Sequence, residues 1–345
     1  KEGKKVWEFF AKEGWTTNNQ EINYLNDVSN GNMYIDDQLV VANLTAPRAK
    51  AFRHTDIVET FGPLTARVDL RKISTRRKDY SEWTRMKADY LKYLPNNKRS
   101  ELQGNVELHK KDSSIYAQKV YIDHEIRVAD IAEAVRLKRA DGTLRSDNMR
   151  YFGPEEKIEA VGRVDLNITE AQLKTRIKAD QATFYSDMNR DMILTGSLEV
   201  AQDKKLAIAP SGIYSQKSQR LILKNGVKAI FEKAKAVLKE ESIRKLKSKE
   251  ANQILKTKTV LTSVELIIFT NTGNAQADGQ VFVTQQGREA KAEHALYDDT
   301  QETITLTGDV FMKKAQEWVR ARQVVVSVKD ETFEAVGSVE AEFKL

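Results

Sequence analysis

The chain has 345 residues, of which 40% are hydrophobic, with a formal net charge of +6 and no cysteine. The lack of cysteine excludes disulfide bonds and thiolate metal sites, and it leaves the cellular compartment open. No stretch approaches the roughly 18 consecutive apolar residues that a membrane-spanning helix needs. By length alone the chain could form two domains.

Residues 1–40 lack the pattern that organises the rest of the chain. They begin W-E-F-F-A-K, continue through T-T-N-N-Q, and predict a short helix or a loose N-terminal arm. No signal-peptide-like segment stands at the start, and the first residue is Lys1 rather than Met. We therefore expect that a leader or a membrane anchor preceded it.

From residue 41 onward one pattern recurs. In the copy that contains Ala88, Leu91 and Tyr93, a small residue is followed by two apolar residues and then by Gly104, which lies 11 residues after Tyr93. Eight copies keep this spacing at 11 or 12 residues, and a weaker ninth opens the series. A period near 30 residues indicates a repeat architecture. The final positions of the copies are Gly62, Gly104, Glu133, Gly162, Gly196, Gly226, Gly279, Gly308 and Gly337.

Within each copy the hydrophobic period is two residues. Around Gly308, the alternate residues Ile304, Leu306, Val310 and Met312 are apolar, whereas those between them are mostly polar. This alternation predicts strands with one buried face. A glycine on that face is normally retained for a bend or a bulge, so we expect each long strand to fold over there. The predicted fold is all-β, an elongated stack of bent antiparallel strands that forms a single domain over residues 41–345.

Two insertions interrupt the regular spacing and hold the basic excess. The step from glycine to the next copy takes 13 residues in five cases but 37 in one, which places an extra segment at residues 234–257. Its strong helix formers predict a helix. A smaller insertion lies near residues 71–87. Net charges of +7 over residues 71–99 and +5 over residues 231–258 indicate solvated loops or patches that face acidic lipid head groups; nucleic-acid binding is the remotest alternative.

Catalytic and metal-binding signatures are absent from the sequence. It contains no G-x-S-x-G, G-x-x-x-x-G-K-[ST], G-x-G-x-x-G or H-E-x-x-H. The four histidines, His54, His109, His124 and His294, fall in different copies. We therefore predict a protein that is not an enzyme and that uses neither a cofactor nor a metal.

The C-terminal part of the chain carries a family resemblance. It reads G-Q-V-F-V, then A-K-A-E-H-A-L-Y-D-D-T-Q-E-T-I-T-L-T-G-D-V-F-M, then V-R-A-R-Q-V-V-V-S-V-K-D-E-T-F-E-A-V-G-S-V. These strings resemble the OstA-like repeat of the lipopolysaccharide-transport proteins LptA and LptC. The resemblance is clear from Gly279 to the C-terminus, good from Gly104 to Gly226, and weak before residue 60.

The resemblance implies both a fold and a function. The fold would be a β-jellyroll, or β-taco, whose groove carries the acyl chains of lipopolysaccharide or a related glycolipid through the periplasm. The partners would be other OstA-like modules of a bridge between an inner-membrane transporter complex and an outer-membrane translocon. Three roles stay open: an LptC-like receiver tethered to the inner membrane by an N-terminal segment, an LptA-like bridge, or both roles in one chain.

The alternation of apolar and polar residues predicts a groove without reference to the family resemblance. Two apolar walls that do not meet leave a trough, and a long apolar strip normally marks a binding surface. The small residues Ala160, Ala182 and Ala295 favour such a trough over the alternative, a structural or adhesive β-repeat protein with a closed core and no lipid ligand. The residues predicted to point into the groove are Val106, Leu108, Ile122, Val164, Leu166, Phe184, Leu198, Val200, Val281, Val283, Val310 and Met312.

The C-terminal end of the chain predicts an interaction edge. Val339, Ala341 and Phe343 alternate with charged residues, and no proline follows them. An unblocked strand edge recruits another strand. We therefore expect pairing with another module, including head-to-tail pairing between copies of this chain.

Overall fold

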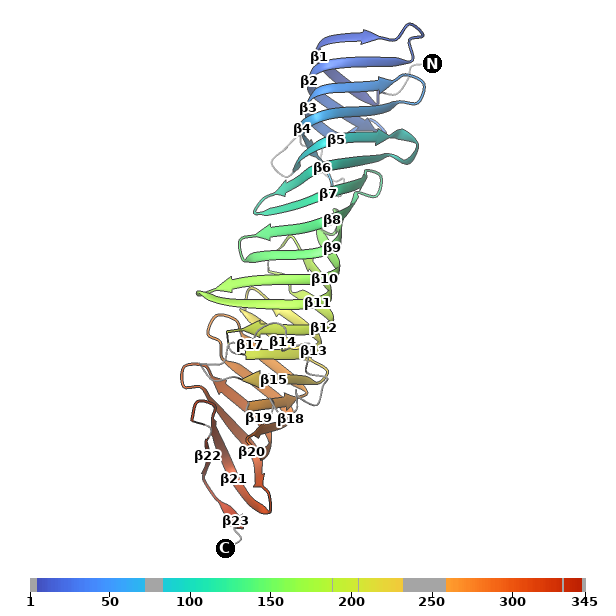
Figure 1. Ribbon diagram of the computed structural model, residues 1–345. Helices are drawn as coiled ribbons and strands as arrows, with labels where there is room; N and C mark the ends of the chain where they lie inside the picture. Colours follow the sequence, from blue (N-terminus) through green and yellow to red (C-terminus); the bar gives the residue numbers. More distant parts are fainter. Residues whose placement is uncertain are drawn as a thin grey trace. The chain divides into compact units, whose positions relative to one another are not determined.

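The computed structural model describes residues 5–71, 83–187, 189–203, 205–231, 259–330 and 332–342. Within these ranges the chain forms 23 strands and no α-helix (Figure 1). The prediction of an all-β chain of stacked antiparallel strands is confirmed. The helix predicted for residues 234–257 and most of the insertion near residues 71–87 lie outside the described residues.

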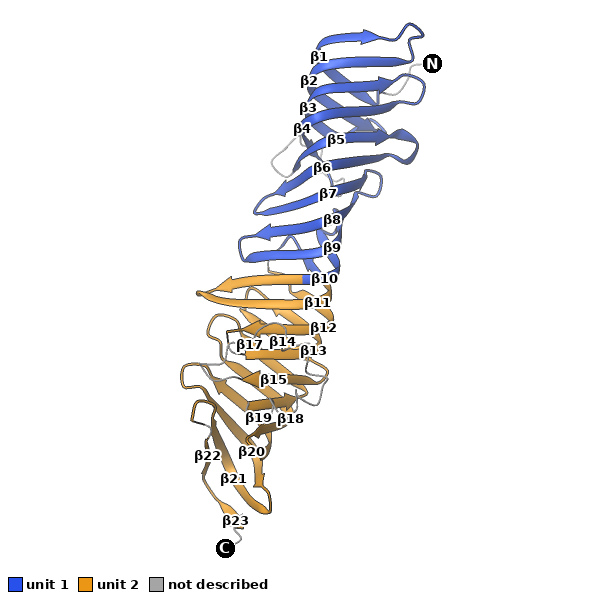
Figure 2. Ribbon diagram, viewed as in Figure 1, with its two compact units in different colours: residues 1–164, 183–187 blue, residues 165–182, 188–345 orange. Residues whose placement is uncertain are grey.

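The chain divides into two compact units (Figure 2). Unit 1 comprises residues 1–164 and 183–187, and unit 2 comprises residues 165–182 and 188–345. The single domain expected over residues 41–345 stays a prediction.

Unit 1 is a series of strands in which each pairs antiparallel with the next, from β1 to β9. A short 3-10 turn at Pro95–Asn97 separates β5 from β6. The strands are β1 (Trp7–Thr16), β2 (Ile22–Ile35), β3 (Gln38–Phe52), β4 (Ile57–Val68), β5 (Thr84–Leu94), β6 (Arg99–Lys110), β7 (Ser113–Asp123), β8 (Val128–Arg139) and β9 (Gly142–Phe152). The strands β10 (Lys157–Glu170) and β11 (Leu173–Tyr185) contribute residues to both units.

Unit 2 continues the antiparallel pattern, with some bent strands divided into two halves. Both β14 and β15 pair with β13, and both β16 and β17 pair with β18. At the end of the chain, β22 and β23 both pair with β21. The strands are β12 (Met192–Gln202), β13 (Lys205–Ser215), β14 (Arg220–Lys224), β15 (Val227–Phe231), β16 (Thr259–Ser263), β17 (Glu265–Phe269), β18 (Ala275–Gln285), β19 (Arg288–Asp298), β20 (Thr303–Lys314), β21 (Glu317–Ser327), β22 (Thr332–Val336) and β23 (Glu340–Glu342).

The sequence predicts a short helix or a loose arm near the start of the chain. The helix is wrong, because this segment is strand β1. Trp7 and Phe9 stack with ring centroids 5.0 Å apart, which places residues i and i+2 on one face, as in a strand. Strand β2 then buries Val28 and Met33. The segment from Trp7 to Ile35 therefore extends the sheet, with β1 paired to β2 and β2 paired to β3.

Each repeat glycine marks a bulge, as the sequence predicts. Gly104 has a φ of 72°, and the pairing of β6 with β7 shifts by one residue between Gln103 and Val106. In the copy without glycine, Glu133 takes a φ of 65°, and the pairing of β8 with β9 shifts beside it. An extra residue bends a strand and increases its twist. The bulges therefore divide the strands that carry them into two arms.

The core of unit 1 includes one histidine. His124 is 3% exposed, and its Nε2 lies 2.7 Å from Ser100 Oγ. Burial lowers the pKa of His124 from 6.5 to about 3. The folded protein therefore holds a neutral imidazole at neutral pH.

We expect His124 to make the protein less stable as the pH falls from 7 to 5. The unfolded chain takes up a proton at this histidine near pH 6.5, but the folded chain does not until about pH 3. Protons therefore favour the unfolded state in this window, by about 1.4 kcal/mol per pH unit below 6.5. Urea unfolding of wild type and of His124→Gln at several pH values measures the effect. The excess in the free energy of unfolding of wild type over His124→Gln should shrink towards pH 5. The control is His54→Gln, at an exposed position.

Candidate functional site

The inward faces of the two arms form two apolar walls. Of the twelve residues predicted to point into a groove, eleven are buried and Met312 is half-buried. Their sequence neighbours Glu107, Asp165 and Asp309 face outward and are at least partly exposed. The alternation thus continues on both sides of each bulge. Contact of these residues with a lipid stays a prediction.

The two walls lie close together. Leu102 and Ile122 in unit 1 and Leu198 and Leu306 in unit 2 are 0% exposed. Between the walls of unit 2 lies a cavity of about 20 Å³, with Val200, Phe231 and Ile268 among its lining residues. A volume of this size holds about one water molecule. The space between the walls is therefore filled by side chains.

The turns of each unit lie at two edges of its sheet. In unit 1, edge A comprises the turns 53–56, 95–98, 124–127 and 153–156, together with the strand ends that adjoin them. Edge B comprises the turns 36–37, 111–112 and 140–141, residues 69–71, and the adjoining strand ends. In unit 2, edge A contains residues 216–219, 270–274, 299–302 and 328–330, and edge B contains residues 171–172, 203, 286–287 and 315–316, again with their strand ends.

The two edges of unit 1 meet. A strand as long as β6, which has 12 residues, would hold opposite edges of a flat sheet roughly 40 Å apart. Lys98 Nζ on edge A nevertheless donates to Asp36 Oδ2 on edge B over 3.1 Å. The arms are therefore folded onto each other, and the line along which the edges meet is the mouth of the groove.

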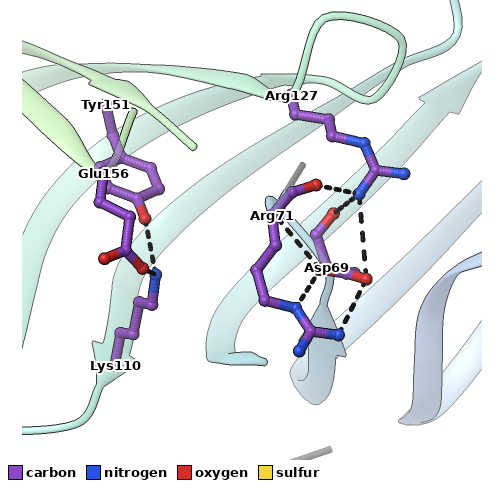
Figure 3. A network of polar contacts seen from close by, with 6 residues as sticks. All are labelled: Asp69, Arg71, Lys110, Arg127, Tyr151 and Glu156. Carbon is purple, nitrogen blue, oxygen red and sulfur yellow. Dashed lines mark hydrogen bonds and ion pairs between the residues drawn. The ribbon is translucent and has the colours of Figure 1, made fainter. Parts of the chain in front are cut away.

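Two further clusters bridge the mouth of unit 1 (Figure 3). Lys110 Nζ, at edge B, donates to Tyr151 Oη over 2.9 Å and to Glu156 Oε1 over 2.6 Å, both at edge A. Arg127, at edge A, donates to the carbonyl oxygen of Arg71, and its Nη1 lies 3.8 Å from Asp69 Oδ2. These two acceptors belong to edge B. Each bridge joins an edge B turn to the edge A turn that follows three strands later.

The environment of these groups favours their pairing. The Arg127 side chain is 7% exposed, and burial lowers its pKa. Burial also disfavours the Lys110 ammonium, but Tyr151 and Glu156 outweigh that effect, so the pKa of Lys110 is raised. Both side chains are cations at neutral pH. Their contacts are therefore charge-assisted hydrogen bonds, which are stronger than neutral ones.

Unit 2 has a mouth of the same kind. Lys205 Nζ donates to the carbonyl oxygen of Gly273 over 2.9 Å and to Asp299 Oδ1 over 2.5 Å. It also lies 5.4 Å from the centre of the Tyr297 ring, whose pKa is raised by burial and by Asp299. Lys205 and Gly273 also line the small cavity between the walls. This bridge therefore covers the cavity.

A carboxylate makes a second bridge in unit 2. Glu170, at edge B, accepts a hydrogen bond from Tyr214 Oη over 2.6 Å and another from the Thr270 hydroxyl group. Further along, Gln285 Nε2 donates to the carbonyl oxygen of Ser327 over 3.3 Å. The acceptors and donors again come from opposite edges.

The mouth residues were not predicted as site residues from the sequence, although the sequence contains a pattern that identifies them. Lys110 continues the inward series of Val106 and Leu108, and Gln285 continues that of Val281 and Val283. A polar residue at the end of an inward-facing apolar series is the signature of an edge contact. The facing Tyr151, Tyr214 and Tyr297 occupy the second apolar position of their repeats.

The predicted C-terminal interaction edge lies in the open. Val339 is 48% exposed, and Ala341 is exposed within β23; Phe343 lies outside the described residues. Among the described strands, β22 and β23 pair only with β21. At the other end of the chain β1 pairs only with β2 among the described strands, and Phe10 on it is 60% exposed.

Other kinds of site are not found in the part of the chain that the structure describes. There, no group of three or more histidine, aspartate and glutamate side chains is placed to hold a metal ion. No helix within the described ranges is long and apolar enough to span a membrane.

Comparisons with known proteins assign the chain to a family. LptH, "the LptA homologous periplasmic component of the conserved lipopolysaccharide transport device from Pseudomonas aeruginosa", is similar over 37% of this chain and 82% of its own chain, with 12% identity and a TM-score of 0.29. No curated protein matches the chain. The family model described as LptA/(LptD N-terminal domain) LPS transport protein matches residues 85–332, well over half of the chain. The chain therefore belongs to the LptA/LptD N-terminal family of lipopolysaccharide-transport proteins.

Proposed function

We propose that the chain is a non-enzymatic carrier that holds lipopolysaccharide acyl chains between its two walls and passes them on towards the outer membrane. The single observation that carries this proposal is the inward apolar series, which recurs in strand after strand within each unit. Burial of an acyl chain contributes roughly 0.8 kcal/mol per CH₂ group. Because successive strands offer similar walls, a lipid would gain little by stopping at any one of them.

The family supports a place and a class of partners for the carrier. A lipopolysaccharide-transport component of this family would work in the periplasm, between transport components of the two membranes. The exposed strands at the ends of the chain, β1 and β23, fit pairing with other modules of the same fold. Whether the role is LptA-like or LptC-like depends on which neighbours these strands meet.

The closeness of the two walls favours a second candidate function, that of a structural protein. A cavity of only about 20 Å³ suits a structural repeat protein with a dry core. In that case the protein would act through its outer faces and edges, and no lipid would enter. The two candidates differ in whether a ligand can reach the inward residues.

Photo-crosslinking distinguishes the two candidates. We expect a photo-reactive amino acid at Val106 or Val310 to capture added lipopolysaccharide, because these side chains face inward. The same group at Asp165 or Asp309 should capture little, because these positions face outward. Mass spectrometry of the crosslinked protein identifies the lipid. Equal capture at inward and outward positions, or none at all, would favour the structural candidate.

A further inference from the structure

The closed walls impose a requirement on any carrier function, and the inference below rests on the proposed function. Leu102 and Leu198 are 0% exposed, so no acyl chain fits between the walls as they stand. The walls must separate before a lipid enters. Separation at the mouth breaks the contacts that join edge A to edge B.

Cations make the strongest of these contacts. Each donates from one edge to acceptors on the other, and most are well buried: the side chains of Arg127, Lys110 and Lys205 are 7%, 12% and 14% exposed. The bridges are Lys98 to Asp36, Lys110 to Tyr151 and Glu156, Arg127 to Asp69 and the Arg71 carbonyl, and Lys205 to Asp299 and the Gly273 carbonyl.

We infer that these cations form a gate over the groove, and that an anionic head group opens it by taking the place of their protein acceptors. A purely apolar ligand that parted the edges would leave Arg127 and Lys110 without partners in a poorly hydrated place. An unpaired buried charge is strongly unfavourable. A phosphate at the base of the acyl chains would restore the lost contacts, since both cation types bind phosphate well.

Such a gate selects the class of its ligand and the orientation in which the ligand binds. The ligand is an amphiphile whose anionic groups lie next to its acyl chains. Its chains lie between the walls, and its phosphates lie at the mouth, beside Lys110 and Arg127. A lipid of equal chain length without an anionic group would open the gate less readily, because it offers the cations nothing in place of their protein acceptors.

A crosslink across the mouth tests the gate. The chain has no cysteine, so Asp36→Cys with Lys98→Cys can be joined by a short bis-thiol reagent without side reactions. The matched control is Lys98→Cys with Glu125→Cys, because Lys98 also contacts Glu125 Oε1 over 2.9 Å and both belong to edge A. Uptake is measured as capture of lipopolysaccharide by a photo-reactive group at Val106.

We expect the crosslink across the mouth to reduce capture at Val106 at least tenfold, and the crosslink within edge A to leave it unchanged. Reduction of a cleavable reagent should restore capture. Undiminished capture with the mouth crosslinked would overturn the inference while leaving the carrier function intact. A wild type that captures nothing at Val106 would instead refute the carrier function itself.

Charge removal tests the role of the cations. The probes are lipopolysaccharide and the same lipopolysaccharide stripped of its phosphates. Wild type should prefer the phosphorylated form, and Lys110→Met, which keeps the length and apolar stem, should lose at least tenfold of that preference. Lys110→Arg should retain it, as should Arg85→Met on the exposed outer face. An unchanged preference in Lys110→Met, checked to be folded by circular dichroism, would show that Lys110 is only a structural contact.

Discussion

Replacement of Gly153 by alanine should force apart the two edges of unit 1. A Cβ atom at this position would lie 1.7 Å from the carbonyl oxygen of Leu70 and 2.9 Å from that of Arg127. Both neighbours are backbone atoms, so no rotamer change relieves the overlap. The segment that carries Asp69 and Arg71 must move away, which breaks its contacts with the Arg127 guanidinium group.

The expected cost is about 3 kcal/mol of the free energy of unfolding, at the upper end of the range for overpacked sites. Urea unfolding measures it. The control is Gly14→Ala, where the nearest atom to the new Cβ is a Leu25 methyl group at 3.2 Å, and we expect little change there. A Gly153→Ala protein as stable as wild type would show that the two edges do not touch in solution.

The same variant also bears on the gate. If the edges are parted by the alanine, lipid should reach Val106 faster than in wild type, although the protein is less stable. A purely structural contact between the edges would lower the stability without raising the rate of capture. The two measurements together therefore separate the two roles of this contact.

The sequence predicts the two-residue period and the bend positions because each is a local property. Alternation around Gly308 and the recurrence of glycine at a set spacing depend only on near neighbours in the chain. The repeat spacing also predicts the bend position at Glu133, although this copy has no glycine. Positive φ values at both residue types show that the position, and not the glycine, defines the bulge.

The N-terminal strands were missed for the opposite reason. W-E-F-F-A-K carries no repeat signature, and its pairing with β2 is decided by a partner some 20 residues later. Trp7 stacks on Phe9 because pairing with β2 holds the segment in the extended conformation of a strand. Propensity in a short segment yields to tertiary context in such cases.

The mouth contacts could not be derived from local pattern, because they join residues 41 or more positions apart. Lys110 and Glu156 meet only because the strands bend at their bulges and the sheet twists, so that each turn faces one three strands away. The sequence shows that Lys110 continues an inward series. It does not show which acidic residue or tyrosine stands opposite.

Truncation of Leu102 should strongly destabilise unit 1. This side chain is 0% exposed and lies on an inner wall, between Ser100 and the bulge at Gly104. If the walls meet in the empty protein, Leu102→Ala removes contacts on both sides and leaves a cavity. Substitutions of this kind cost about 2 to 5 kcal/mol.

The size of the cost reports the state of the groove. In a water-filled trough, one side of Leu102 would already face solvent, and its truncation would cost well under about 2 kcal/mol, since only part of the transfer free energy would be lost. Gln103→Ala, on the exposed outer face of the same strand, provides the control and should change the stability by no more than about 0.5 kcal/mol.

Lipid sharpens this measurement. With lipopolysaccharide bound, acyl carbons would replace the opposite wall as the neighbour of residue 102, and they can settle into the space that alanine leaves. The destabilisation by Leu102→Ala should therefore be smaller when unfolding is followed in the presence of the lipid. The destabilisation by Gly153→Ala should also be smaller, but for another reason: the bound lipid has already parted the edges. If Leu102→Ala lowers the free energy of unfolding only slightly in the absence of lipid, the walls stand apart in the empty protein. The groove would then be open already, and the cations at the mouth could not act as its gate.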